Sequence, residues 1–394
     1  MSLATRALQI LKDRRDRILR GLINCLPFPF PRFRVWFPGI ERARYYLVTA
    51  NQKIGKSKFA DKVFVYDPFF YFLENPQQGS VKVLYFTREM SKEDKMMEFY
   101  SHLLYRLSNK SIRISPVDLK STRADKPVPQ EVLDLLESEE YTRYINSFAN
   151  TVTFIDDIGN PTGVNKYCRA WAAEHGHFTY TTIKKKDPDT GREEEIEVID
   201  QYIPDDPEQI VIIIFDNASN IIEESNLGKM GSIEKLSKYF VTLRNQLGMS
   251  PVLIQHQAQA QEGTDNIKLK LMKPSASGLA DCKSTIRDIN TAFGLYSPFK
   301  FGEHSYEGYN IDMFRNNIRF MEIIDDRDNG AGGLVCPLYF DGAVGVFEEL
   351  PRADDKEAIQ GVYNFLNRLR GNTLMTVHKN KTKRFFTNLF KKNG

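Results

Sequence analysis

Short apolar runs alternate with amphipathic stretches through the middle of the chain. Apolar runs of strand length occur at residues 45–50, 81–87, 151–155, 210–216 and 251–255. Between them, apolar side chains recur at helical spacing over residues 59–72, 92–106, 163–175 and 233–247. Strands that alternate with helices predict βαβ units, and therefore an α/β fold with a mainly parallel central sheet. The run at 210–216 is largely β-branched, so we expect that strand to be buried on both faces.

Three segments interrupt this alternation. Residues 3–23 have an amphipathic helical pattern that stops before a proline-rich stretch. Residues 178–202, with turn residues near their middle, predict an inserted β-hairpin. Residues 257–283 show no clear periodicity, which predicts a long loop. We therefore expect an N-terminal amphipathic linker helix and proline-rich link at 1–32, a core at 33–350 that carries the hairpin, and a C-terminal helix and basic tail at 351–394.

Composition narrows the class of protein. The 394 residues are 41% hydrophobic and include four cysteines without a Cys-x-x-Cys pair. These values argue against a disordered or fibrous protein, a disulfide framework and a structural zinc site. No apolar run approaches the length of a membrane span. Charged residues interrupt the N-terminal apolar pattern, so we expect no signal peptide and a cytoplasmic location.

The net charge of +3 is unevenly distributed along the chain. Residues 1–44 carry a net charge of +7 and residues 376–394 carry +6, which leaves −10 for the remaining residues. Basic ends on an acidic body suggest segments that meet phosphate or another subunit's acidic surface. Solvated tails are the simpler alternative, and the charge pattern leaves both open.

The strongest local motif follows the first expected strand and precedes a helix. It consists of Ala50, Asn51, Gln52, Lys53, Ile54, Gly55, Lys56 and Ser57. Backbone N–H groups of such a loop and the following helix N-terminus cradle phosphate oxygens. Lys56 would contact the β- and γ-phosphates, and the Ser57 hydroxyl would coordinate Mg²⁺. Ala50 occupies a position that is usually glycine, which a backbone with negative φ permits. A chance Gly-Lys-Ser before a helix is the alternative.

Two carboxylates complete the expected nucleotide site. Asp216 ends the apolar run at 210–216 and could hold Mg²⁺ through water. Glu89 follows the run at 81–87 directly, where a carboxylate could orient and polarise a water that attacks the γ-phosphate. Each also has a structural alternative: Asp216 as a simple strand terminus, and Glu89 as a carboxylate stabilising a helix N-terminus.

Taken in order along the chain, these motifs resemble the RecA-type ATPase core of DnaB-like replicative helicases. The resemblance covers roughly residues 33–350. Further blocks that carry it are Thr87-Arg88-Glu89-Met90-Ser91, Phe154-Ile155-Asp156-Asp157, residues 251–259, residues 284–296 and residues 325–330. The resemblance implies that Glu89 is catalytic, that Gln257 senses the γ-phosphate, and that Arg327 is an arginine finger acting on a neighbouring subunit. A surface Arg327 paired with adjacent aspartates is the alternative.

The sequence departs from the family pattern at three places. Asp325 stands where the family has a lysine, with an additional residue, Asp328, before the glycine. Asn290 replaces a second aspartate. The chain has no room for the family's globular N-terminal domain, which indicates a phage or mobile-element version located in the host cytoplasm. Residues 3–23 resemble the linker helix that such proteins pack against the adjacent subunit.

The resemblance also implies partners. We expect a homo-oligomer, most simply a hexamer, that uses ATP and Mg²⁺, binds single-stranded DNA, and meets a primase or loader, with no membrane contact. The loops expected to face DNA offer Lys229, Lys268, Lys270 and Lys273, although each could equally lie in a solvated loop. The leading hypothesis is an ATP-driven, ring-forming DNA helicase. The alternatives are a RecA-like DNA-binding, recombination or assembly factor without unwinding activity, and a packaging motor, for which the expected downstream nuclease motif is missing.

Overall fold

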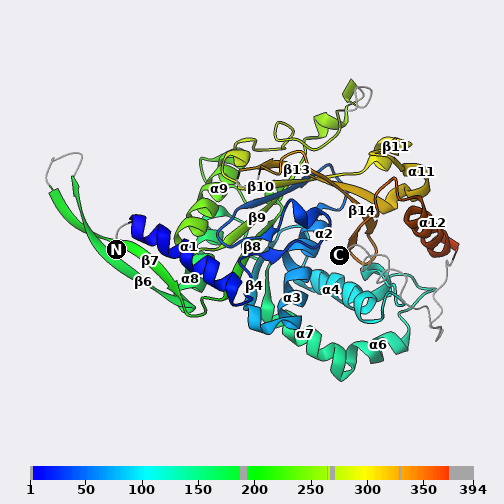
Figure 1. Ribbon diagram of the computed structural model, residues 1–394, viewed down its shortest axis with the longest axis horizontal. Coiled ribbons are helices and arrows are strands. Elements are labelled where there is room, and N and C mark those ends of the chain that lie inside the picture. The colour runs from blue at the N-terminus through cyan, green and yellow to red at the C-terminus, as the bar shows by residue number, and fades with distance from the viewer. Residues whose placement is uncertain (1–2, 187–192, 264, 267–270, 328–329, 372–394) are drawn as a thin grey trace.

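The computed structural model describes residues 3–371, apart from 187–192, 264, 267–270 and 328–329. A nine-stranded sheet runs through the centre of the molecule (Figure 1). Its strands, in spatial order, are β15 (Val346–Glu349), β14 (Val335–Asp341), β13 (Ile318–Asp326), β10 (Thr291–Tyr296), β3 (Tyr46–Ala50), β9 (Ser250–His256), β8 (Gln209–Asp216), β4 (Ser80–Thr87) and β5 (Val152–Ile155). The six from β10 to β5 are parallel, and β13 to β15 extend the sheet in antiparallel fashion. The expectation of a mainly parallel α/β sheet is confirmed.

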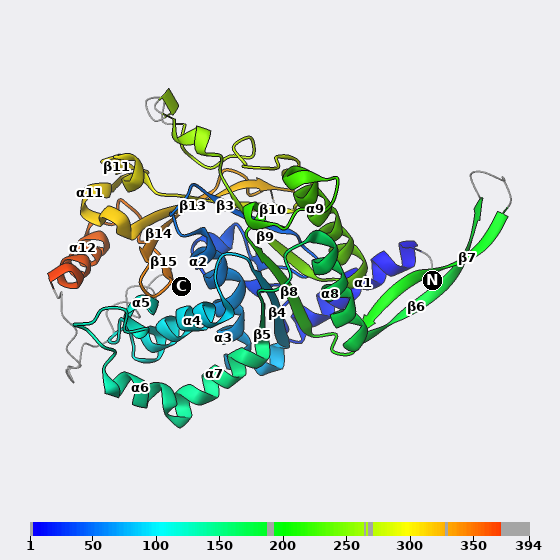
Figure 2. The same ribbon diagram turned by 180° about the vertical axis from the view of Figure 1, so that it is seen from behind.

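Helices cover both faces of this sheet (Figures 1 and 2). One face packs on α2 (Lys56–Asp61), α3 (Asp67–Glu74), α4 (Lys92–Leu107) and α7 (Glu139–Thr151). The opposite face packs on α8 (Pro161–Glu174) and α9 (Gly228–Leu247). Strand β8 shows why its sequence is apolar throughout, because Ile212 and Ile214 enter the first core while Ile213 and Phe215 enter the second.

The proline-rich link is part of the core. Short strands β1 (Leu26–Pro27) and β2 (Gly39–Ile40) pair with each other, and between them the chain turns inward. Phe28 is fully buried and stacks on Phe293 of β10 at 5.6 Å between ring centroids. The expected boundary at residue 33 therefore does not separate a linker from the core, because the phenylalanines that alternate with the prolines are buried.

Two elements extend from this body. Helix α1 (Leu3–Leu19) leaves apolar side chains such as Leu11 and Leu19 about two-thirds exposed. The expected hairpin is a two-stranded ribbon of β6 (Gly176–Lys186) and β7 (Glu193–Pro204), which projects from the body next to α1 (Figures 1 and 2). Arg6 of α1 contacts Asp200 of the ribbon at 3.3 Å. The hairpin's expected turn, at 187–191, lies outside the described residues.

A third apolar cluster lies at the antiparallel end of the sheet, where C-terminal helix α12 packs. The remaining α-helices and strands are α5 (Pro116–Leu119), α6 (Gln130–Glu137), β11 (Ser305–Tyr306), β12 (Tyr309–Asn310), α11 (Ile311–Phe314) and α12 (Lys356–Gly371). Among the described residues, none of the helices is both long enough and apolar enough to cross a bilayer. The basic tail after residue 371 is outside the described part of the chain.

Candidate nucleotide site

The loop at 50–57 joins β3 to α2 at the carboxyl edge of the parallel strands. Ala50 is the last residue of β3, and its extended conformation explains why alanine is tolerated there. The backbone then turns through left-handed conformations at Lys53 (φ 61°) and Gly55 (φ 102°). A Cβ at Gly55 would lie 3.0 Å from Cζ of Phe340, a tight contact, so both the conformation and the space favour glycine. Such a turn ending at a helix N-terminus aims N–H groups at an anion.

Asn51 adds a polar side chain to this loop. It is only 1% exposed, and neither its amide nitrogen nor its amide oxygen has a hydrogen-bond partner among the described residues. Buried polar atoms are rarely left unpaired unless a ligand or water completes them. The loop thus has the features expected of a phosphate-binding site.

Lys56 lies in the loop beside His256, a residue that the sequence motifs do not single out. Its ammonium donates to Nε2 of His256 at 3.0 Å. Burial lowers the pKa of Lys56, and nearby Asp216 and Glu89 oppose that change. Burial and the Lys56 charge both lower the pKa of His256, so the imidazole is neutral at neutral pH. His256 is directly opposite Ala50 in the β3–β9 register, which places it beside the loop.

Ser57 and Asp216 form an oxygen-rich pair at the same edge. The Ser57 hydroxyl donates to Oδ1 of Asp216 at 3.1 Å, and Oδ2 accepts from the Tyr85 hydroxyl at 3.0 Å. Burial raises the pKa of Asp216, against which the charges of Lys95 and Lys56 act. A hydroxyl and a carboxylate suit Mg²⁺, which usually takes few protein ligands and completes its shell with water and phosphate. The described residues contain no group of three or more His, Cys, Asp or Glu that could hold a metal ion.

Glu89 is exposed at the turn between β4 and α4. Asn217, next to Asp216, donates from Nδ2 to Oε2 of Glu89 at 2.8 Å. The N-terminus of α4 is instead capped by Ser91, which accepts from the N–H of Asp94. The alternative reading of Glu89 as the stabilising group of this helix is therefore unnecessary, and the carboxylate is available to a water near the loop.

Gln257 is not where the resemblance placed it. Its side chain is 2% exposed and bonds to Thr49, whose neighbours Val48 and Ala50 face the core that α2 covers, so Gln257 lies on the opposite face. Its Nε2 donates to Oγ1 of Thr49 at 3.0 Å and to the carbonyl of Ser275 at 3.1 Å, while its Oε1 accepts from the N–H of Ser275. Because successive side chains of a strand point to opposite faces, His256 faces the phosphate loop and Gln257 does not. The alternation of Val252, Ile254 and His256 with their neighbours was the signal that could have identified the histidine.

Arg327 follows β13, near the amino ends of the parallel strands and opposite the end that carries the phosphate loop. Asp326 pairs with Thr291, which in turn pairs with Tyr46 at the start of β3, whereas Lys56 follows the end of β3. The two ends are on the order of 13 Å apart along β3 alone. The Arg327 side chain is exposed and donates to the backbone carbonyls of Ile286 and Arg287. The structure therefore does not bring Arg327 to its own chain's phosphate loop.

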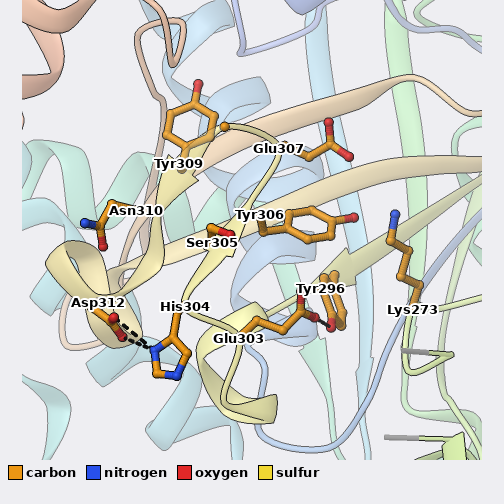
Figure 3. Close-up of a pocket in the computed structure, with 11 residues that line it drawn as sticks. Lys273, Tyr296, Glu303, His304, Ser305, Tyr306, Glu307, Tyr309, Asn310 and Asp312 are labelled. Atoms are coloured by element: carbon orange, nitrogen blue, oxygen red, sulfur yellow. Dashed lines mark hydrogen bonds and ion pairs between the residues drawn. The ribbon is translucent and has the colours of Figure 1, made fainter. Parts of the chain in front are cut away.

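The lysines expected to bind DNA are placed differently from one another. Lys229 is exposed in the first turn of α9. Lys273 lies beside Tyr306, with its ammonium 4.8 Å from the ring centroid, in a pocket of about 660 Å³ (Figure 3). Burial acts to lower the pKa of Lys273, but the Tyr306 hydroxyl and the charges of Glu322 and Glu307 raise it overall. Lys268 and Lys270 are outside the described residues.

Comparison with known proteins gives the fold an independent reference. No protein-family model matches the sequence, and none of the curated proteins matches it. Among solved structures, one described as an ATPase domain superposes with a TM-score of 0.62 at 15% identity, covering 89% of this chain and 99% of that one. A DnaB-like replicative helicase, described with its interactions with primase, gives 0.59 at 14% identity, covering 88% of this chain and 67% of that one. The chain therefore has the RecA-like fold of the ATPase domains of DnaB-like replicative helicases.

Proposed function

We propose that this protein is an ATP-driven, ring-forming DNA helicase that translocates on single-stranded DNA. The observation that carries the proposal is the convergence of Lys56, Ser57, Asp216 and Glu89 at one edge of the sheet. A phosphate-binding loop, a metal-suited hydroxyl–carboxylate pair and an exposed carboxylate are the parts required for hydrolysis of a β–γ phosphoanhydride. Helicase activity in replication is proposed from the fold these residues share with the two solved structures.

The roles follow from the positions of the side chains. N–H groups of the loop would bind phosphate oxygens, with the Lys56 ammonium moving from His256 to the β- and γ-phosphates. Ser57 and Asp216 would hold Mg²⁺, which neutralises phosphate charge when bound. Glu89 would orient the attacking water and accept its proton. His256, within hydrogen-bond distance of Lys56, would contact the terminal phosphate and report its loss to β9.

Assembly is proposed from two features of the monomer. Arg327 is at the opposite end of the strands from its own phosphate loop, which leaves it free to act on a neighbour's nucleotide. Helix α1 leaves an apolar face exposed, which a second subunit could cover. A head-to-tail contact closes into a ring when the rotation between subunits closes, and gives a filament otherwise; we propose a closed ring of six subunits. A primase or loader would be a further partner.

Contact with DNA is proposed through the loops that follow β8 and β9. Lys229 is exposed to solvent and suits a sequence-independent contact with phosphate. Lys268 and Lys270 stay proposals from the sequence alone. Lys273 is the weakest of the four, because it is already engaged by Tyr306 among acidic neighbours.

The test is ATP hydrolysis by the purified protein with and without single-stranded DNA. We expect DNA to stimulate hydrolysis and Lys56→Ala to abolish it, while Lys166→Ala, which removes an exposed lysine of α8, leaves it unchanged. Absence of hydrolysis in the unaltered protein would refute the proposal. Displacement of a strand from a forked duplex then separates a helicase from the second candidate, a RecA-like DNA-binding or assembly factor. That candidate is favoured by the contacts of Arg327 with its own chain, and turnover without displacement would support it.

A further inference from the structure

The Asp216 carboxylate contacts a buried cluster, formed around Tyr85 and Lys95, that is separate from the phosphate loop. The Tyr85 hydroxyl donates to Oδ2 of Asp216 at 3.0 Å, and the ammonium of Lys95 lies 4.6 Å from the centroid of the Tyr85 ring. Both residues are buried, Tyr85 completely and Lys95 to 2% exposure. Tyr85 comes from β4, Lys95 from α4 and Asp216 from β8, so three elements meet at this carboxylate.

The Lys95 ammonium is itself held by two carboxylates. It donates to Oδ2 of Asp61 at 2.7 Å and to Oε2 of Glu98 at 3.2 Å. Lys58 donates to the other oxygen of Glu98 at 2.7 Å, so two cations balance two anions. Asp61 and Lys58 belong to α2, the helix that begins at Lys56. The cluster therefore links α2, the helix that follows the phosphate loop, to Tyr85, which contacts Asp216.

A packing role alone does not account for these charges. Burying ions carries a large desolvation penalty, and apolar side chains of similar size usually stabilise a core as well or better. A hydroxyl that hydrogen-bonds one oxygen of a metal-binding carboxylate orients that carboxylate, because residues that contact a metal ligand set its direction. A cation over the ring face is attracted to the ring and strengthens the hydroxyl as a donor.

We propose that Tyr85 and Lys95 are positioning residues that orient the Asp216 carboxylate toward a Mg²⁺–nucleotide complex. The proposal rests on the proposed ATPase function and extends it to residues that do not touch the nucleotide. With Oδ2 held by Tyr85, Oδ1 is the oxygen shared with Ser57 and directed to the metal side. Lys95, anchored to Asp61, keeps the Tyr85 ring in place when the loop binds phosphate.

The test compares Tyr85→Phe with Tyr45→Phe. Both variants keep the ring and remove one buried hydroxyl, but the Tyr45 hydroxyl bonds to Ser237 at 3.2 Å on the other face of the sheet. The dissociation constant of a fluorescent, non-hydrolysable ATP analogue is measured in Mg²⁺ and in EDTA. We expect Mg²⁺ to tighten binding by the unaltered protein, and Tyr85→Phe to lose about tenfold or more of that gain with little change in EDTA. Tyr45→Phe should retain it.

The outcomes separate this inference from the function on which it rests. If the unaltered protein binds no analogue in either condition, the proposed function fails. If it binds with a Mg²⁺-dependent gain that Tyr85→Phe retains in full, the inference is overturned. Lys95→Met alone would leave the Asp61 carboxylate buried without its cation. The double variant K95M/D61N removes both charges and is therefore tested alongside Lys95→Met. A folded K95M/D61N protein with the full Mg²⁺-dependent gain would remove Lys95 from the proposal.

Discussion

His256 and Gln257 are adjacent residues that we expect to respond to alanine substitution in opposite ways. His256 lies beside Lys56 at the phosphate loop, whereas Gln257 is buried on the opposite face of the sheet. We therefore expect His256→Ala to reduce turnover while leaving the fold intact. Gln257→Ala should reduce the stability of the fold while the remaining folded protein turns over ATP almost normally.

The magnitudes follow from the contacts that each substitution removes. Gln257 makes hydrogen bonds with Thr49 and with both backbone groups of Ser275. At about 1 kcal/mol for each bond, its loss should lower the free energy of unfolding by roughly 2–3 kcal/mol, and the melting temperature by a few degrees. His256 is only half-buried and loses one hydrogen bond on substitution. Once Lys56 has moved to phosphate, we expect the neutral imidazole to carry its proton on Nε2 and to donate to the terminal phosphate; removing one such donor typically lowers kcat by about 10²-fold.

The assay pairs steady-state ATP hydrolysis, normalised to folded protein, with thermal unfolding. His256→Gln serves as the control, since an amide at this position restores hydrogen-bonding capacity and should recover part of the turnover. The reasoning would be refuted if Gln257→Ala lowered kcat about 10²-fold at an unchanged melting temperature while His256→Ala was fully active. That result would mean that the face assignment of the two side chains does not describe the working enzyme.

Three further predictions concern the neighbouring subunit, pH and the loop. Arg327→Ala should lose hydrolysis, and mixing it with Lys56→Ala should restore part of the activity, because mixed interfaces pair an intact arginine with an intact loop; no recovery on mixing would count against action between subunits. Burial lowers the pKa of His102 to about 3, below its unfolded value, so this residue's contribution to stability is lost as the pH falls from about 6.5 toward 3. His102→Phe should reduce the change of melting temperature with pH between roughly pH 4 and 6.5, whereas His177→Phe, at an exposed position, should not. An unchanged pH dependence in His102→Phe would contradict the role given to His102. Gly55→Ala should weaken binding of an ATP analogue in both Mg²⁺ and EDTA, since a Cβ there meets Phe340 and φ is 102°; unchanged affinity would show that the loop is not held in this conformation.

Local features of the sequence were sufficient to predict five parallel strands, four helical segments between them and the phosphate loop. Apolar runs of strand length predicted β3, β4, β5, β8 and β9 within about a residue at most ends, because a strand between two helical layers must be apolar on both faces. The loop was recognisable because its function depends on the backbone of consecutive residues. Helices α6 and α7, by contrast, were not predicted, although the apolar residues of each gather on one helix face.

Side-chain placement across strands required the tertiary structure. Whether His256 or Gln257 faces the phosphate loop depends on which face of β9 is covered by α2. The position of Arg327 depends on β13, which runs antiparallel to β10. The buried cluster around Lys95 brings residues from three separate parts of the chain together, and of these only Asp216 is distinctive in sequence. The sequence by itself thus determined five of the six parallel strands, four helical segments between them and the expected phosphate-binding motif. Only the tertiary structure decided which polar side chains meet there, because those contacts join residues far apart in the chain through the register of the sheet.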